Sequence, residues 1–386
     1  MLRIRSIRAA GVAASVADPD LARLAGELPA RAELWCVKDR RRDAEGRLRE
    51  AVDGLRRRAP ELAASTGLLP WQRRTIAGLS AAGIAGAIAA PQLALMVLLA
   101  LLAVPFLMVA ALRTLALWDL MSREAGPTEG MEMLGDDELP SYSVLVPLFR
   151  EAGVVPHLLQ ALRGIDYPRD KLDVLLLVES IDVETQAALA ETKLDAHMRV
   201  IVVPDGAPRT KPRALQYALQ LTRGMNVVVF DAEDVPEPDQ LRRAAAALAA
   251  GAGRLGCLQG RLNIYNPDAS WFTRQFAIEY TALFDCILPL LQRLRLPVPL
   301  GGTSNHFPRA VLDAVGGWDP FNVTEDADLG IRLARCGYEV GVLASTTWEE
   351  APATASVWSG QRRRWLKGWM RLSNSKHNIL IYMYKI

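Results

Sequence analysis

An uncharged stretch of 38 residues, 75–112, is the feature that most constrains the fold. A single helix of that length would measure about 57 Å at ~1.5 Å per residue, whereas the hydrocarbon core of a bilayer is ~30 Å thick. Two helices that reverse near Pro91 fit better, and basic residues at Arg74 and Arg113 flank the stretch, as expected if both ends face the cytoplasm. We therefore expect a transmembrane hairpin over residues 75–118. A single span that starts near Pro91 and a buried hairpin of a soluble protein are the alternatives.

Composition argues against several classes of function. The net charge of +2 is far from the basic excess of a surface that follows nucleic acid, so no nucleic-acid partner is expected. The four cysteines lack CxxC spacing and are interpreted as reduced packing residues, and the four histidines are equally dispersed. No apolar run follows the first arginines, so the sequence predicts no secretory signal.

Composition also divides the rest of the chain into regions. Residues 1–74 are rich in Ala, Arg, Leu and Glu, which predicts a small helical cytoplasmic module. Residues 119–140 carry Gly, Pro and carboxylates, as is typical of a linker, and residues 141–372 have the pattern of an α/β domain. Residues 373–386 shift abruptly to Asn, Lys, Ile and Tyr, so we expect an atypical tail that would fit a truncated chain.

Short apolar runs alternate with helical stretches in the α/β domain. This alternation predicts βαβ units and a mostly parallel sheet, and ligands of such sheets bind beyond the carboxyl ends of the strands. The expected strands are 143–146, 174–178, 200–203 and 227–230, and the expected helices are 154–163, 185–194, 212–221 and 239–250.

Two acidic motifs follow this pattern. Asp231-Ala232-Glu233 comes directly after an expected strand, where two carboxylates could hold one Mg²⁺ or Mn²⁺ together with substrate phosphates. The alternative is the start of a helix. Thr324-Glu325-Asp326 could present an ionised carboxylate as a general base. A capping box with Thr324 as N-cap is the alternative there, and the two interpretations are compatible.

A basic and aromatic run, Gln361-Arg362-Arg363-Arg364-Trp365, lies near the end of the chain. It could supply a cation to a pyrophosphate and an aromatic face to a sugar ring, or it could belong to a helix on a membrane surface. With Glu179, Asp231-Ala232-Glu233 and Thr324-Glu325-Asp326 it forms an ordered series of four motifs. In that order, from about residue 139 to 370, the chain resembles family 2 glycosyltransferases of the cellulose-synthase-like kind, and especially bacterial membrane exopolysaccharide synthases.

The resemblance implies a GT-A type nucleotide-sugar-binding fold and a role for each matching residue. Glu179 stands where the family has an Asp, and Glu233 replaces the second Asp of the family's metal motif. The resemblance assigns Asp326 as catalytic base and Asp231 and Glu233 as ligands of Mg²⁺ or Mn²⁺. The residues implied to bind the nucleotide sugar are Pro147, Glu179, Asp182, Lys211, Asp231, Gln361, Arg364 and Trp365. Those implied to contact the acceptor are Gly302, Thr303, Ser304, Glu325 and Trp365.

The resemblance further implies an inverting, metal-dependent transfer of a sugar from a nucleotide donor, expected to be a UDP-sugar, to a growing polysaccharide. The expected location is the cytoplasmic face of the inner membrane, with a multi-pass anchor, contact with lipid, and export or regulatory subunits as further partners. Family members normally continue with more spans after the last motif, which this sequence does not show. The alternatives are a single transfer to a lipid carrier and a catalytically idle scaffold of a surface-polysaccharide or receptor assembly.

Overall fold

The computed structural model describes residues 41–60, 62–63, 70–122, 132–251, 253–322 and 324–374. Most of the predicted module over residues 1–74 and nearly all of the predicted tail over 373–386 lie outside these residues. The described part belongs to one structural unit, 34–386. Its centre is an eight-stranded sheet with the strand order β3-β2-β1-β4-β7-β6-β8-β5. The strands are β1 (Tyr142–Leu148), β2 (Leu172–Glu179), β3 (Met198–Val203), β4 (Asn226–Val229), β5 (Val235–Pro236), β6 (Leu255–Ile264), β7 (Asn305–Pro308) and β8 (Glu339–Glu349).

The first four strands of the α/β domain confirm the alternation expected from the sequence. β3, β2, β1 and β4 pair in parallel, and each is joined to the next by a segment that contains a helix. The second half of the sheet differs, because β7 runs antiparallel to both β4 and β6, and β5 runs antiparallel to β8. β6 and β8 still pair in parallel, so the expectation of a mostly parallel sheet fails only at β5 and β7, and the sheet is mixed.

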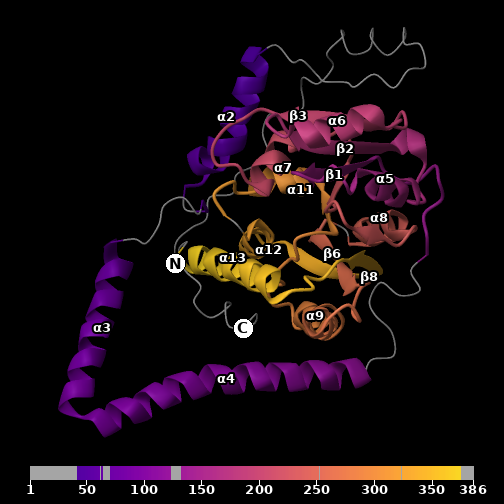
Figure 1. The fold of residues 1–386 in the computed structure, drawn as a ribbon. Coiled ribbons are helices and arrows are strands. Elements are labelled where there is room, and N and C mark those ends of the chain that lie inside the picture. Colours follow the sequence, from indigo (N-terminus) through magenta and orange to yellow (C-terminus); the bar gives the residue numbers. More distant parts are fainter. Residues whose placement is uncertain are drawn as a thin grey trace. The chain divides into compact units, whose positions relative to one another are not determined.

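Helices cover both faces of the sheet (Figure 1). Alternate side chains of β1 enter two separate cores, with Val144 and Val146 on the face covered by α5 and α8, and Leu145 on the face covered by α7, α11 and α12. The helices in the described residues are α2 (Arg41–Arg58), α3 (Pro70–Ala89), α4 (Pro91–Ser122), α5 (Val155–Arg163), α6 (Val183–Glu191), α7 (Lys211–Leu219), α8 (Gln240–Ala250), α9 (Trp271–Thr281), α10 (Leu288–Arg293), α11 (Arg309–Val315), α12 (Glu325–Arg335) and α13 (Ala355–Asn374), with the short turn η2 (Arg169–Lys171) and the π-helical segment η3 (Ala282–Ile287).

Helix α4 is the only helix within the described ranges that is long and apolar enough to cross a membrane. Its apolar stretch is exposed, whereas Leu112, Ala116 and Asp119 near its C-terminal end are buried. Leu112 and Ala116 join the core that contains Leu145, and Asp119 pairs with Arg293 at the end of α10. Helices α3 and α4 meet at Ala90, but a hairpin of two spans is not confirmed, since α3 does not qualify as a span.

Helix α2 packs against α7, although α3 and α4 lie between them in the sequence. Its residues Ala51 and Leu55 are buried, and Gln220 Nε2 donates a hydrogen bond of 3.1 Å to the carbonyl oxygen of Arg47. This part of the predicted N-terminal module therefore packs on the α/β domain.

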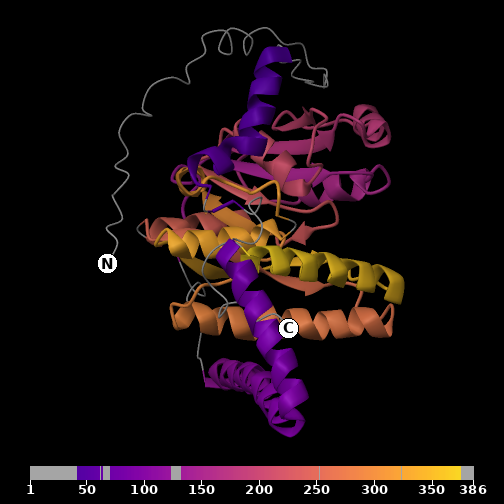
Figure 2. The ribbon, with the colours of Figure 1, turned by 90° about the vertical axis from the view of Figure 1, so that its left-hand side faces the viewer.

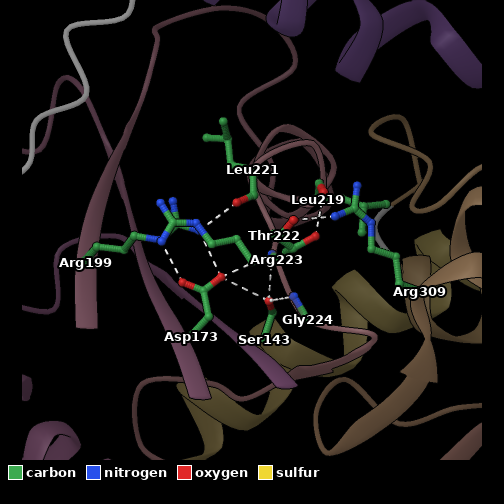
Figure 3. A network of polar contacts seen from close by, with 9 residues as sticks. All are labelled: Ser143, Asp173, Arg199, Leu219, Leu221, Thr222, Arg223, Gly224 and Arg309. Atoms are coloured by element: carbon green, nitrogen blue, oxygen red, sulfur yellow. Dashed lines mark hydrogen bonds and ion pairs between the residues drawn. The ribbon is translucent and has the colours of Figure 1, made fainter. Parts of the chain in front are cut away.

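A polar network holds the amino ends of the parallel strands together (Figure 3). Arg199 donates two hydrogen bonds of 2.8 and 2.9 Å to Asp173 and one of 2.6 Å to the carbonyl oxygen of Leu221. Ser143 Oγ donates to Asp173 at 3.1 Å and accepts from the Gly224 amide at 2.8 Å. A Cβ at residue 224 would lie 2.3 Å from the Ser143 amide nitrogen, so only glycine fits there. The network ties together the amino ends of these strands. The polar side chains of the predicted site lie at the opposite, carboxyl ends.

Candidate active site

Most of the sequence-predicted site residues lie at the carboxyl edge of the sheet. Pro147 and Glu179 lie at the ends of β1 and β2. Asp231 comes two residues after the last residue of β4. Lys211 is the first residue of α7, and Glu325 is the first residue of α12. The ends of parallel strands and the starts of the helices that follow them meet at the same edge, which explains how motifs far apart in the sequence converge.

Lys211 connects two of the predicted motifs. Its Nζ donates a hydrogen bond of 2.5 Å to Asp231 Oδ1 and one of 2.7 Å to the carbonyl oxygen of Gly302. Burial alone would lower the pKa of Lys211, but the charges of Asp231 and Glu325 outweigh it and hold the pKa above its ordinary value. Lys211 therefore stays charged and ties the loop after β4 to the loop before β7.

Asp326 lies on the other side of Gly302. A Cβ built at residue 302 would be 3.9 Å from Asp326 Oδ2 and 4.0 Å from Lys211 Nζ. Asp326 Oδ1 accepts a hydrogen bond of 2.7 Å from the Ala327 amide at the start of α12, where the helix dipole favours a negative charge. Thr324 is the N-cap of α12, but the capping box considered as the alternative does not form, since Thr324 makes no side-chain capping bond and its hydroxyl donates to Asn322 instead.

Seven carboxyl groups gather around this point, and burial is the main cause of every raised pKa among them. The Glu325 pKa rises to about 7 through burial and the charge of Asp326. Burial and the charge of Asp231 also raise the pKa of Glu151 and Glu233, and burial and the charge of Asp234 raise that of Glu349. The set is Glu151, Asp231, Glu233, Asp234, Glu325, Asp326 and Glu349.

The surplus of negative charge fits a divalent cation. Asp234 Oδ1 is buried and has no hydrogen-bond partner among the described residues, and burial and the charge of Asp231 raise the Asp234 pKa well above its ordinary value. A preformed cage of three or more metal-ligating side chains does not occur in the part of the chain that is described. Mg²⁺ usually takes one or two carboxylates and completes its shell with substrate phosphates and water. Asp231 and Glu233 can serve such an ion.

The loop over residues 301–304 presents mainly its backbone to the site. Thr303 is buried and its hydroxyl donates to Asp234 and, at 3.1 Å, to the carbonyl oxygen of Val229. Ser304 is buried too, with a positive φ of 55°, and its hydroxyl donates to Thr347 at 2.6 Å. These two hydroxyls are occupied within the protein, so Gly302 is the residue of this loop that reaches the centre of the site.

Two further predicted nucleotide contacts also have partners inside the protein. Glu179 pairs with Arg213, and both side chains are buried. Asp182 is the N-cap of α6, where it accepts from the Thr185 amide at 3.2 Å and from the Arg150 amide at 2.5 Å. Burial raises the Asp182 pKa, but these hydrogen bonds outweigh it and lower the pKa. Both residues stabilise loops at this edge of the sheet, and a direct contact of either with a nucleotide donor stays a prediction.

Helix α13 carries the last predicted motif across this region, next to the start of α12. A Cβ at Gly368 would lie 2.3 Å from Thr324 Cγ2, so the α13 backbone rests on the turn that presents Asp326. The Trp365 ring packs 6.0 Å from the Phe276 ring of α9. Gln361 Oε1 is buried without a hydrogen-bond partner among the described residues, and Arg364 is exposed.

Several residues of this region escaped the sequence analysis as site residues. Arg362 was predicted only as part of the run 361–365, and Arg213 and Asp234 were not among the predicted site residues. Glu349 was not predicted either, although a carboxylate that closes a segment rich in Val, Leu and Thr, 340–348, is a signal that could have revealed it.

The sequence profile of the family described as "Glycosyltransferase like family 2" matches residues 140–368. This match covers more than half of the chain, and the chain therefore belongs to this family.

Two curated relatives and one solved structure extend the comparison. The probable glycosyltransferase YdaM of Bacillus subtilis is 30% identical over 241 residues, covering 60% of this chain and 56% of that protein. The beta-monoglucosyldiacylglycerol synthase of Synechocystis is 31% identical over 265 residues, covering 66% and 54%. The chain thus spans about half the length of these relatives. The mannosyltransferase PcManGT from Pyrobaculum calidifontis, solved with GDP-Man and Mn²⁺, shares the fold at a TM-score of 0.56 and 21% identity, over 74% of this chain and 77% of that one.

Proposed function

We propose that this family 2 glycosyltransferase performs an inverting, metal-dependent transfer of a sugar from a nucleotide diphosphate donor to an acceptor at the cytoplasmic face of the inner membrane. A growing polysaccharide is the acceptor that the Gln361-Arg362-Arg363-Arg364-Trp365 run favours. The observation that carries the proposal is the position of Lys211, which bonds to Asp231 at 2.5 Å and to the Gly302 carbonyl at 2.7 Å. Donor and acceptor motifs thereby share one centre.

Asp326 is the proposed general base. It lies beside Gly302, where an acceptor sugar can approach the backbone closely because no side chain intervenes. Asp326 takes the proton of the acceptor hydroxyl, whose oxygen bonds to the anomeric carbon from the face opposite the leaving group. The bond between that carbon and the diphosphate oxygen breaks, and the departing nucleoside diphosphate keeps the electron pair.

Positive charge must meet the departing diphosphate. Arg364 is exposed on α13 and is free to turn toward it. A divalent cation bound by Asp231 and Glu233 would add Lewis-acid stabilisation of the same oxygens. Lys211 keeps Asp231 in place by the hydrogen bond described above. The solved mannosyltransferase, whose structure is in complex with GDP-Man and Mn²⁺, supports including that donor and that ion in tests of this chain.

A lipid acceptor is the second candidate. The relative from Synechocystis carries a name that denotes synthesis of a glycolipid, and the buried C-terminal turns of α4 attach the candidate membrane helix to the catalytic half. The location of the radiolabelled sugar distinguishes the two acceptors. The label appears in an oligosaccharide in one case and in a lipid extracted with the membrane in the other.

Membranes that contain the protein provide the test. They are supplied with UDP-glucose, UDP-N-acetylglucosamine or GDP-mannose, with Mg²⁺, Mn²⁺ or EDTA. Asp326→Asn should lower transfer by roughly 10²–10⁴-fold and keep nucleotide binding, while Asp268→Asn, at an exposed carboxylate, should change neither. Undiminished transfer by Asp326→Asn would remove Asp326 as the base. Absence of both transfer and donor hydrolysis with every donor would favour the idle scaffold.

A further inference from the structure

Arg362 occupies an aromatic cage between α9 and α13. Its guanidinium carbon lies 4.8 Å from the ring centroid of Trp365 and 5.3 Å from those of Phe276 and Trp358. The same guanidinium pairs with Glu279, one turn after Phe276 on α9. Figure 2 shows α13 and the segment from α9 to α10 crossing the molecule near each other. The side chain of Arg362 therefore connects its own helix, α13, to α9, which lies about 80 residues earlier in the sequence.

The chemistry of the cage suits arginine specifically. Arg362 Nε is buried and has no hydrogen-bond partner among the described residues, so aromatic faces surround part of the cation where water or an acceptor would otherwise be. A planar guanidinium can stack on rings and still donate to a carboxylate at its edge, whereas an ammonium group has no planar face with which to stack. An exposed ion pair alone would contribute little. The rings make this contact more than a surface pair.

The cage lies within the segment of α13 that matters for transfer. Arg362 directly follows Gln361. Arg364 comes two residues after it and Trp365 three residues after it. Two turns further on, Gly368 rests against Thr324. Helix α13 is thus held at two points, by α9 through Arg362 and by the start of α12 through Gly368, and Arg364 projects between them.

We propose that Arg362 is a positioning residue that locks α13 onto α9 and so holds Arg364 and Trp365 over the donor and acceptor. The inference rests on the proposed transfer function. Arg362 itself touches neither substrate. When the contact with α9 is lost, α13 occupies its competent position for a smaller fraction of the time. The apparent affinity for the donor decreases in proportion to that fraction.

The test compares four single variants by steady-state kinetics. Arg362→Met keeps an apolar chain in the cage but removes the charge, and it should lower kcat/KM for the donor by roughly 10²-fold, with a raised donor KM. Arg362→Lys retains the charge and should recover about a tenth of wild-type activity. The kcat/KM of Glu279→Gln should lie between the values of these two variants. Arg274→Gln on α9 removes an exposed ion pair with Asp268 and serves as the matched control, with unchanged kinetics.

Two further measurements separate positioning from folding. The double variant Arg362→Met with Glu279→Gln should be no worse than Arg362→Met alone, because both changes break one lock. Thermal unfolding should show that the variants remain folded at the assay temperature. Equal kcat/KM for wild type and Arg362→Met would overturn the inference, as would losses that track unfolding alone in all variants. Inactive wild type with every donor would instead count against the proposed function.

Discussion

Replacing Glu325 by glutamine tests the electrostatics of the site most directly. Glu325 is buried at the first position of α12, where burial and then the charge of Asp326 raise its pKa, and the charge of Lys211 opposes them. A rise from 4.5 to about 7, at 1.36 kcal/mol per pKa unit, corresponds to about 3 kcal/mol in the free energy of unfolding. The ionised carboxylate is therefore a substantial destabilising element of the folded protein.

The sign of the pH dependence follows from proton binding. The folded state holds the Glu325 proton more tightly than the unfolded state, so it binds more protons between about pH 4.5 and 7. Stability contributed by this group is complete below pH 4.5 and is lost as the pH rises toward 7. Glu325→Gln, which never ionises, should therefore raise stability at pH 8 by up to about 3 kcal/mol and change it little at pH 5.

Thermal unfolding of the detergent-solubilised protein at pH 5 and pH 8, followed by tryptophan fluorescence, measures the effect. At roughly 2–4 °C per kcal/mol for a domain of this size, Tm should rise by about 6–12 °C at pH 8. Glu191→Gln, at an exposed carboxylate of α6, is the control and should leave Tm unchanged. A variant that stabilises equally at both pH values, or not at all at pH 8, would refute the reasoning about burial of charge.

Two further substitutions test how the site is held together. Lys211→Met removes the bonds to Asp231 and the Gly302 carbonyl and should lower transfer by about 10²-fold or more, as measured by radiolabel incorporation; activity near wild type would show that the two motifs do not depend on this bridge. Gly368→Ala places a methyl group 2.3 Å from Thr324 Cγ2. It should lower the free energy of unfolding by about 1–3 kcal/mol and reduce transfer activity. In Gly360→Ala, on the same helix, the methyl group meets nothing within 4 Å, so this control should be neutral in both assays.

The elements that the sequence predicts well are those whose signal is local. The buried strands β1, β2, β3 and β4 and the helices after them were found within a few residues, because continuous apolar runs and helical periodicity mark them. The reversal of β7 left no such mark. Its four residues, Asn305–Pro308, pair antiparallel with β4 and β6, and a short strand's direction depends on the path of the chain, which periodicity does not record.

The site divides in the same way. The acidic motifs could be predicted because each is contiguous, whereas the partners of their members are remote in sequence. Nothing near Glu179 signals that Arg213 takes its carboxylate, and nothing near Asp182 signals the amide of Arg150. Such pairings decide whether a polar residue faces the ligand or supports the loop that does. They are set by tertiary packing and follow from the structure alone.

The structure also shows that the candidate membrane helix and the active site are connected by packing as well as by the chain. The pair of Asp119 and Arg293 fixes the end of α4 to α10, and α10 continues η3 and α9 without a break. Within that helical segment, near the end of α9, Glu279 pairs with Arg362 of α13. A flexible tether would need no buried aspartate at such a junction. The packed junction instead joins α4, through residues 271–293, to the helix that carries Arg362.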